Sequence, residues 1–176
     1  MNDALLLVDI IQDFRHEEGE ALLRSFQERH DGLTAALARA REREIPIVYA
    51  NDNNGIWDGD ARRLVRHAID EGLGGELVAA VSPHDGDRFV VKPRYSAFDH
   101  TPLDIILREL EIERILLAGT ATEGCVVQTA IDAREKGFKV TVLPEACATN
   151  DERLEKIALE YLEEVVGARL GADEGA

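Results

Sequence analysis

One of the two cysteines, Cys125, stands where the surrounding pattern would make a thiol reactive. An apolar run over 115–118 predicts a buried strand, and residues 119–124 predict a tight turn. A helical pattern then runs from Cys125 to a stop at Gly137. The amino-terminus of a helix carries partial positive charge and unpaired N–H groups, which favour a thiolate and can hold an oxyanion. This segment therefore points to a hydrolase that attacks a carbonyl group with a cysteine.

Two other ionisable residues, Asp9 and Lys92, also follow short apolar runs, over 4–8 and 88–91. The carboxyl ends of parallel strands meet at one edge of a sheet, and ligands bind where the strand order reverses. We therefore expect Asp9, Lys92 and Cys125 to converge there as a carboxylate, a cation and a nucleophile. Taken singly, each has an ordinary interpretation, as a turn residue, a surface lysine and a core thiol respectively.

Strands and helices alternate along the chain to position these residues. We expect strands at 4–8, 45–50, 88–91, 114–118 and 138–143, with a sixth near 168–170. Helices are predicted at 18–44 with a break near Asp31 and Gly32, then at 61–70, 76–81, 102–110, 125–136 and 151–166. Thr101 and Asn150 are the expected caps of the helices that follow them. Continuous apolar strands between helices predict one doubly wound α/β domain over 1–176, with a parallel sheet covered on both faces.

Composition limits the classes of partner. The 176 residues carry a formal net charge of −15, which argues against nucleic acid and anionic membrane surfaces because phosphate binding needs clustered Lys and Arg. No apolar run is long enough to span a bilayer, and the start of the chain does not read as an export signal. Two cysteines are too few for a disulfide scaffold. We expect a cytoplasmic protein that acts on a small molecule.

Three segments resemble the isochorismatase-like cysteine hydrolases, a family that includes nicotinamidases and N-carbamoylsarcosine amidases. Residues 5–14, LLLVDIIQDF, resemble the family's first strand and catalytic aspartate. Residues 91–98, VKPRYSAF, resemble its catalytic lysine segment. Residues 119–126, GTATEGCV, resemble its nucleophile turn, and 129–133 the following helix. The resemblance covers nearly the whole chain.

The resemblance implies a three-layer α/β/α sandwich around a doubly wound, six-stranded parallel sheet. It implies a cis peptide between Thr120 and Ala121, which would aim the N–H groups of Ala121 and Cys125 at an oxyanion. It also implies a homodimer or homotetramer. Our hypothesis is that Asp9 is the general base, that Cys125 forms a thioester with an amide, carbamoyl or lactam carbon, and that Lys92 orients Asp9.

The chain departs from the family pattern in ways that narrow the chemistry. Many nicotinamidases hold a metal with an Asp-x-His motif after the second strand, but residues 49–58, YANDNNGIWD, contain no histidine. The five histidines of the chain are scattered without ligand spacing. We expect no metal and no cofactor. True isochorismatases lack the cysteine, so Cys125 argues against vinyl ether cleavage.

Several side chains around the predicted edge are candidates for substrate binding, each with ordinary packing or solvation as its alternative. By position they are Phe14, Asn51, Asn53, Trp57, Tyr95, Phe98 and Glu123. The main alternative for the whole chain is a non-catalytic binding or assembly protein that retains the fold. The presence of all three reactive residues favours the enzyme.

Overall fold

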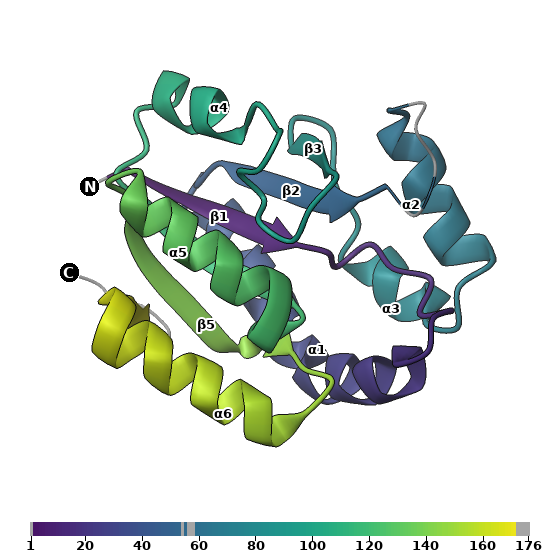
Figure 1. Cartoon of the computed structure of the whole chain (residues 1–176). Coiled ribbons are helices and arrows are strands. Elements are labelled where there is room, and N and C mark those ends of the chain that lie inside the picture. Colours follow the sequence, from purple (N-terminus) through teal and green to yellow (C-terminus); the bar gives the residue numbers. More distant parts are fainter. Residues whose placement is uncertain (1, 54, 56–58, 172–176) are drawn as a thin grey trace.

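The computed structural model describes residues 2–53, 55 and 59–171. Its centre is a parallel sheet of six strands in the order β3-β2-β1-β4-β5-β6 (Figure 1). The strands are β1 Asp3–Val8, β2 Ile47–Asp52, β3 Arg88–Lys92, β4 Arg114–Thr120, β5 Lys139–Ala148 and β6 Arg169–Leu170. The predicted doubly wound parallel sheet is confirmed.

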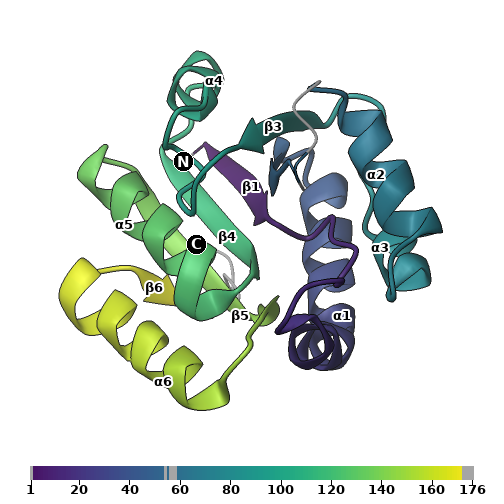
Figure 2. The ribbon, with the colours of Figure 1, turned by 45° about the vertical axis from the view of Figure 1, so that its right-hand side comes forward.

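Helices cover both faces of the sheet and complete a three-layer α/β/α sandwich (Figure 2). On one face lie α1 Gly19–Glu42, α2 Ala61–Asp70 and α3 Gly75–Ala80. On the other lie α4 Leu103–Glu109, α5 Val127–Glu135 and α6 Glu152–Tyr161. A π-helical turn, Thr122–Val126, precedes α5, and a second, Leu162–Val166, extends α6.

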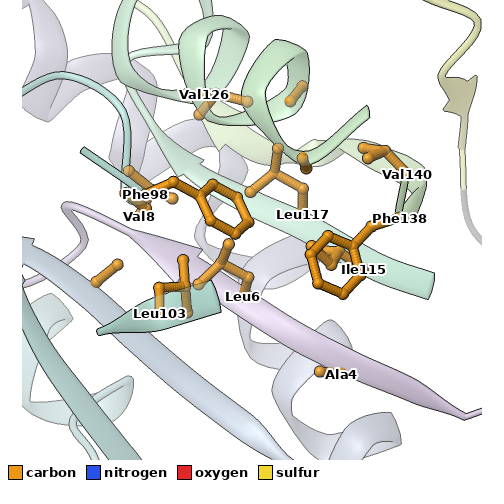
Figure 3. Close-up of a cluster of buried hydrophobic side chains, with 14 of the residues drawn as sticks. Ala4, Leu6, Val8, Phe98, Leu103, Ile115, Leu117, Val126, Phe138 and Val140 are labelled. Atoms are coloured by element: carbon orange, nitrogen blue, oxygen red, sulfur yellow. The ribbon is translucent and has the colours of Figure 1, made fainter. Parts of the chain in front are cut away.

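The two cores explain why the strands are continuously apolar. Successive side chains of a strand point to opposite faces, so Leu5 and Leu7 of β1 pack beneath α1, while Leu6 and Val8 pack beneath α4 and α5. Figure 3 shows the second cluster, in which Leu6 and Val8 lie with side chains from β4, α4 and the loop before it. Every residue of β1 is buried, and from residue 4 to residue 8 both of its faces are apolar.

The strand order reverses between β1 and β4. From β1 the chain builds β2 and β3 on one side, then returns so that β4 pairs with the other side of β1, with Val8 opposite Gly119. A reversal of this kind leaves a crevice beyond the carboxyl ends of the two central strands. The residue after β1 and the turn after β4 are therefore neighbours.

Three local predictions were wrong for identifiable reasons. Helix α1 runs unbroken through Asp31 and Gly32. The glycine serves the packing of β5 and does not end the helix, because a Cβ at this position would lie 2.0 Å from the main-chain oxygen of Glu145. The cap of α6 is Asp151, whose side chain accepts a hydrogen bond from Leu154 N at 3.0 Å, and not Asn150. The helix at Cys125 begins earlier, as the π-helical turn.

Other local predictions agree closely with the structure. Helix α2 has the predicted bounds, 61–70. The predicted cap of α4, Thr101, stands one residue before the observed cap, Pro102, although its Oγ1 accepts a hydrogen bond from Leu103 N at 3.3 Å. Within the described residues, none of the helices is long and apolar enough to cross a bilayer.

Candidate active site

Asp9, Lys92 and Cys125 meet at the carboxyl end of the sheet. The Lys92 Nζ lies 2.7 Å from Asp9 Oδ2 and 3.5 Å from Cys125 Sγ, and it donates a third hydrogen bond to Arg94 O at 2.9 Å. These contacts use all three N–H bonds of the ammonium. The lysine is only 1% exposed. Cys125 is partly exposed, whereas Asp9 and Lys92 are buried, so the cysteine is the residue of the cluster that is open to solvent.

Asp9 is fixed by hydrogen bonds to β2 and by the ammonium of Lys92. Its backbone has a φ of 49°, a left-handed conformation that Asp tolerates better than most residues. Its N–H donates to Ala50 O at 3.0 Å, and its Oδ1 accepts from Asp52 N at 2.7 Å. One carboxylate oxygen is therefore held by β2, and the other contacts the ammonium of Lys92.

Lys92 comes from an edge strand and reaches across its neighbour. It ends β3, where it pairs with Asp52 of β2, and β2 separates β3 from β1. The long side chain of lysine spans this distance and delivers a compact charge between Asp9 and Cys125.

The nucleophile turn begins with a glycine that nothing else can replace. Gly119 has a φ of +140°, and a Cβ there would lie 2.0 Å from Val8 O. The next peptide bond, Thr120–Ala121, is cis. Thr120 Oγ1 donates to Asp9 O at 2.8 Å, and Gln12 Nε2 donates to both oxygens, at 2.8 and 3.0 Å. The turn and the carboxylate segment are thereby tied together.

Gln12 was missed by sequence reasoning. It lies three residues beyond Asp9, inside the segment that carries the family resemblance, and this position was the available signal.

Two acidic side chains, Glu155 and Glu123, connect the nucleophile turn to the helices and the strand that pack around it. The buried Glu155 of α6 accepts from Thr122 Oγ1 at 3.0 Å and contacts Arg29 of α1 at 3.1 Å. Glu123 accepts from Thr149 Oγ1 at 2.7 Å and from Asn150 N at 2.9 Å. Helices α1 and α6 and the end of β5 therefore fix where the sulfur stands.

Burial sets the electrostatics of the cluster. It raises the pKa of the Cys125 thiol to about 12, with the Asp9 charge adding to the shift and Lys92 opposing it. It also raises the pKa of Asp9, against the attraction of Lys92. Burial disfavours the Lys92 ammonium, but Asp9 and Cys125 outweigh it and raise the lysine's pKa. Burial and the Asp9 charge therefore oppose the thiolate that a helix amino-terminus favours.

The structure separates the predicted substrate-binding residues into groups. Phe14 and Phe98 are core residues, packed against Phe26 and Phe138. Tyr95 is 64% exposed. Trp57 lies outside the described residues.

The polar candidates differ in how far their hydrogen-bonding groups are used. The buried amide of Asn51 exchanges two hydrogen bonds of 2.9 Å with the backbone of Ile11, so it fixes the chain beyond Asp9. The carboxylate of Glu123 is engaged as described above. Asn53 is 6% exposed, and its Oδ1 accepts from Gly55 N at 3.0 Å, but its buried Nδ2 has no partner within the described part of the chain. Among these candidates Asn53 retains a donor for a ligand.

Metal ligands do not gather among the described residues, where no group of three or more His, Cys, Asp or Glu side chains could hold an ion. At the end of β2, in the segment where the family's metal motif was sought, the side chain of Asn51 is already bonded to the backbone of Ile11.

Comparison with known proteins shows the family and the fold. The isochorismatase domain family model matches residues 3–174. The isochorismatase family protein YaaI of Bacillus subtilis (strain 168) is 32% identical over 171 residues, covering 97% of this chain and 94% of the relative.

Two solved structures share the fold over nearly their whole lengths. Nicotinamidase PncA from Bacillus subtilis has a TM-score of 0.77 at 28% identity, covering 98% of this chain and all of the other. N-carbamoylsarcosine amidase from Thermoplasma acidophilum has a TM-score of 0.77 at 28% identity, covering 100% and 99%. Both are named for the hydrolysis of C–N bonds other than peptide bonds. The chain belongs to the isochorismatase family.

Proposed function

We propose that the chain is a cysteine-dependent hydrolase of a small-molecule C–N bond, in an amide, a ureido or carbamoyl group, or a lactam. The observation that carries this proposal is the contact of one buried ammonium, Lys92, with both a carboxylate and a partly exposed thiol. The amidase names of the two related structures support the same class of reaction.

The first step is transfer of the thiol proton from Cys125 to Asp9. With its pKa at about 12, the Cys125 thiol would lose almost none of its protons to water at neutral pH, so a base in the site has to take the proton. The pKa of Asp9 is raised, which makes its carboxylate a better base. The transfer moves a negative charge from oxygen to sulfur beside the same ammonium. The net charge of the buried cluster does not change, so no further charge has to be desolvated.

Acylation follows on the carbonyl carbon. The sulfur forms a bond to carbon, and the carbonyl π electrons move to oxygen, where the N–H groups of Ala121 and Cys125 stabilise the oxyanion. Loss of one such donor typically raises the barrier by about 2.7–4 kcal/mol. The C–N bond then breaks, the carbonyl re-forms as a thioester, and the departing nitrogen takes the proton held by Asp9.

Hydrolysis of the thioester restores the enzyme. Asp9, again ionised, takes a proton from water as the oxygen attacks the thioester carbon. Collapse of the second tetrahedral species breaks the C–S bond, and Asp9 returns the proton to the sulfur. Lys92 remains charged throughout and stabilises whichever of its two neighbours is negative.

Asn53 is the recognition residue that we favour among the candidates. Its residue neighbour Asp52 donates to Asp9, so Asn53 lies at the same edge of the sheet. A buried N–H donor without a partner typically costs about 1–3 kcal/mol. A carbonyl or carboxylate oxygen of the substrate would satisfy Nδ2 and recover that energy.

The test is a screen of amides, ureido acids, carbamoyl compounds and lactams for release of ammonia or acid. We expect turnover of at least one class by the wild type and none by Cys125→Ala. With a substrate in hand, rapid quenching and mass spectrometry should find an acyl adduct on Cys125. Turnover by Cys125→Ala at the wild-type rate would defeat the thioester scheme. Tight binding of a compound without turnover would support the non-catalytic alternative.

Asn53 is tested separately, with the substrate found by the screen. Asn53→Ala should raise KM about tenfold, which corresponds to one lost hydrogen bond, and leave kcat within about threefold. Asn2→Ala, at an exposed position, is the matched control and should change neither. An unchanged KM in Asn53→Ala would remove this residue from the site.

A further inference from the structure

A cavity of about 770 Å³ lies between α2 and the β3 edge of the sheet. Its walls are the first two turns of α2, the loop over 83–87 that connects α3 to β3, and Phe89 of β3. Figure 2 shows α2 beside this edge of the sheet. The volume is within the range of about 300–1,000 Å³ that is typical of small-molecule sites. We call this space the α2–β3 cavity, and none of the three residues of the candidate active site lines it.

An aromatic side chain forms one wall of the α2–β3 cavity. The ring of Phe89 lies parallel to that of Tyr49, at an interplanar angle of 7° and a centroid distance of 6.2 Å. Tyr49 belongs to β2, the inner neighbour of β3, and no strand follows β3 on its other side. Phe89 is therefore only partly buried, and Val65 of α2 lines the cavity with it. Aromatic rings favour offset parallel stacking, so this wall suits a planar ligand.

Two arginines of α2 supply positive charge to the same cavity. Arg62 and Arg66 are one helical turn apart, and both line it with exposed side chains. Within the described part of the chain, neither guanidinium has a hydrogen-bond or ion-pair partner. Like charges at this spacing destabilise a helix, and a cation in the first turn is disfavoured by the helix dipole. An anion bound between the two side chains would relieve both effects.

The acidic residues of the cavity are largely engaged in other contacts. Asp87 accepts two hydrogen bonds from the guanidinium of Arg41, at 3.2 and 2.9 Å, and one from His84 N at 2.8 Å. Asp60 caps α2 and accepts from two N–H groups of its first turn, at 3.0 and 3.3 Å. Asp85 is exposed on the loop. The two arginines thus outnumber the one acid that is not engaged, although the chain as a whole carries a net charge of −15.

We propose that the α2–β3 cavity binds a planar aromatic anion. The ring of the ligand stacks on Phe89, and its carboxylate or phosphate accepts hydrogen bonds from Arg62 and Arg66. The planar fork of a guanidinium matches both kinds of anion, and such charge-assisted bonds are stronger than neutral ones. Aromatic carboxylates and nucleoside monophosphates share this chemistry. The proposal does not depend on the hydrolase activity, because the cavity is separate from the reactive cluster.

Binding is tested by titrating the full chain with β-naphthoate and, separately, with adenosine monophosphate while amide NMR spectra are recorded. At least one of the two should bind with a Kd below about 1 mM and shift the amides of residues 61–66 and 83–89. The stronger binder shows whether the site favours a carboxylate or a nucleotide. Two analogues separate stacking from charge: decahydro-β-naphthoate has no flat ring, and β-naphthylmethanol has no charge. Each should bind at least about tenfold more weakly than β-naphthoate.

Variants test the residues that the proposal names. Arg66→Gln and Phe89→Leu should each weaken binding of the stronger probe about tenfold. Arg153→Gln makes the same change of charge at an exposed position of α6 and should stay within about twofold of the wild type. Circular dichroism and Tm check that the variants fold.

Four results would overturn the proposal. The first is the absence of amide shifts with both probes at about 5 mM, which is well above the expected Kd. The second is shifts confined to residues around Cys125, which would place the probe in the active site. The third is equal binding of β-naphthoate and either analogue. The fourth is wild-type affinity in Arg66→Gln or in folded Phe89→Leu.

Discussion

Replacement of Lys92 by methionine removes the cation from the cluster while keeping most of the side chain's volume. The ammonium and Asp9 Oδ2 are 2.7 Å apart, and both side chains are less than 10% exposed. Breaking a buried ion pair from one side typically costs about 3–5 kcal/mol, because the remaining charge is left without compensation. For a chain of this size the corresponding fall in Tm is on the order of 10 °C.

The penalty should depend on pH with a definite sign. The folded-state pKa of Asp9 already lies above its ordinary value of 3.8, since burial outweighs Lys92. Without the lysine it rises further. A group whose folded pKa is raised gives stability at low pH that is lost as pH rises through the folded pKa. The difference in stability between Lys92→Met and the wild type should therefore be largest at pH 7–8 and shrink as pH falls towards 4.

Urea unfolding of a double-mutant cycle measures this effect. Asp9→Asn/Lys92→Met removes both charges and should be clearly more stable than the sum of the single losses predicts, with a coupling of about 3 kcal/mol. Activity should be lost in Lys92→Met at every pH. The reasoning is refuted if Lys92→Met is as stable as the wild type at pH 7, or if the two substitutions add without coupling.

Three further predictions concern the thiol, the turn and the helix that supports it. The rate of iodoacetamide labelling of Cys125 should rise about tenfold per pH unit from pH 7 to 9, since the thiol pKa is about 12. Asp9→Asn should be labelled faster at pH 7, because the carboxylate that raises this pKa is gone. Labelling at a rate independent of pH would contradict the raised thiol pKa. Gly119→Ala should lose more than about 4 kcal/mol of stability or fail to fold, because its Cβ would overlap a main-chain oxygen, whereas Gly124→Ala, with open space around it, should change stability by less than about 1 kcal/mol in thermal melts. Asp151→Ala should lower the free energy of unfolding by about 1 kcal/mol through loss of the α6 cap, and an unchanged midpoint in urea would show that this hydrogen bond is dispensable.

Sequence patterns predicted most of the sheet because its strands are buried on both faces. Such strands are runs of apolar residues, and β1, β3 and β4 were placed to within one or two residues of their structural bounds. Helix α1 shows where local signals fail. From the local sequence, Gly32 predicts a break in the helix. In the structure it instead allows the close approach of β5, which lies more than a hundred residues away in sequence. Close approach between distant segments has no local signature.

The convergence of Asp9, Lys92 and Cys125 could be predicted because each stands at or beyond the end of a strand and because the segments resemble a known family. The raised pKa of the Cys125 thiol could not, because a helix amino-terminus favours a thiolate, while the burial and the adjacent carboxylate that raise this pKa depend on tertiary structure. Two of the aromatic candidates, Phe14 and Phe98, turned out to be core residues for a similar reason. Phe14 lies near Asp9 in sequence, but its ring packs into the core against Phe26.

Lys92 belongs to β3, an edge strand of the sheet, so the position of its ammonium depends on that strand. Strand β3 is five residues long and is bonded to a neighbour on one side only. Fraying of an edge strand needs less energy than unfolding of the domain. Mild denaturant, heat or a substitution that destabilises β3 should therefore move the Lys92 ammonium away from Asp9 and Cys125. Activity should be lost under these conditions while circular dichroism still shows a folded protein.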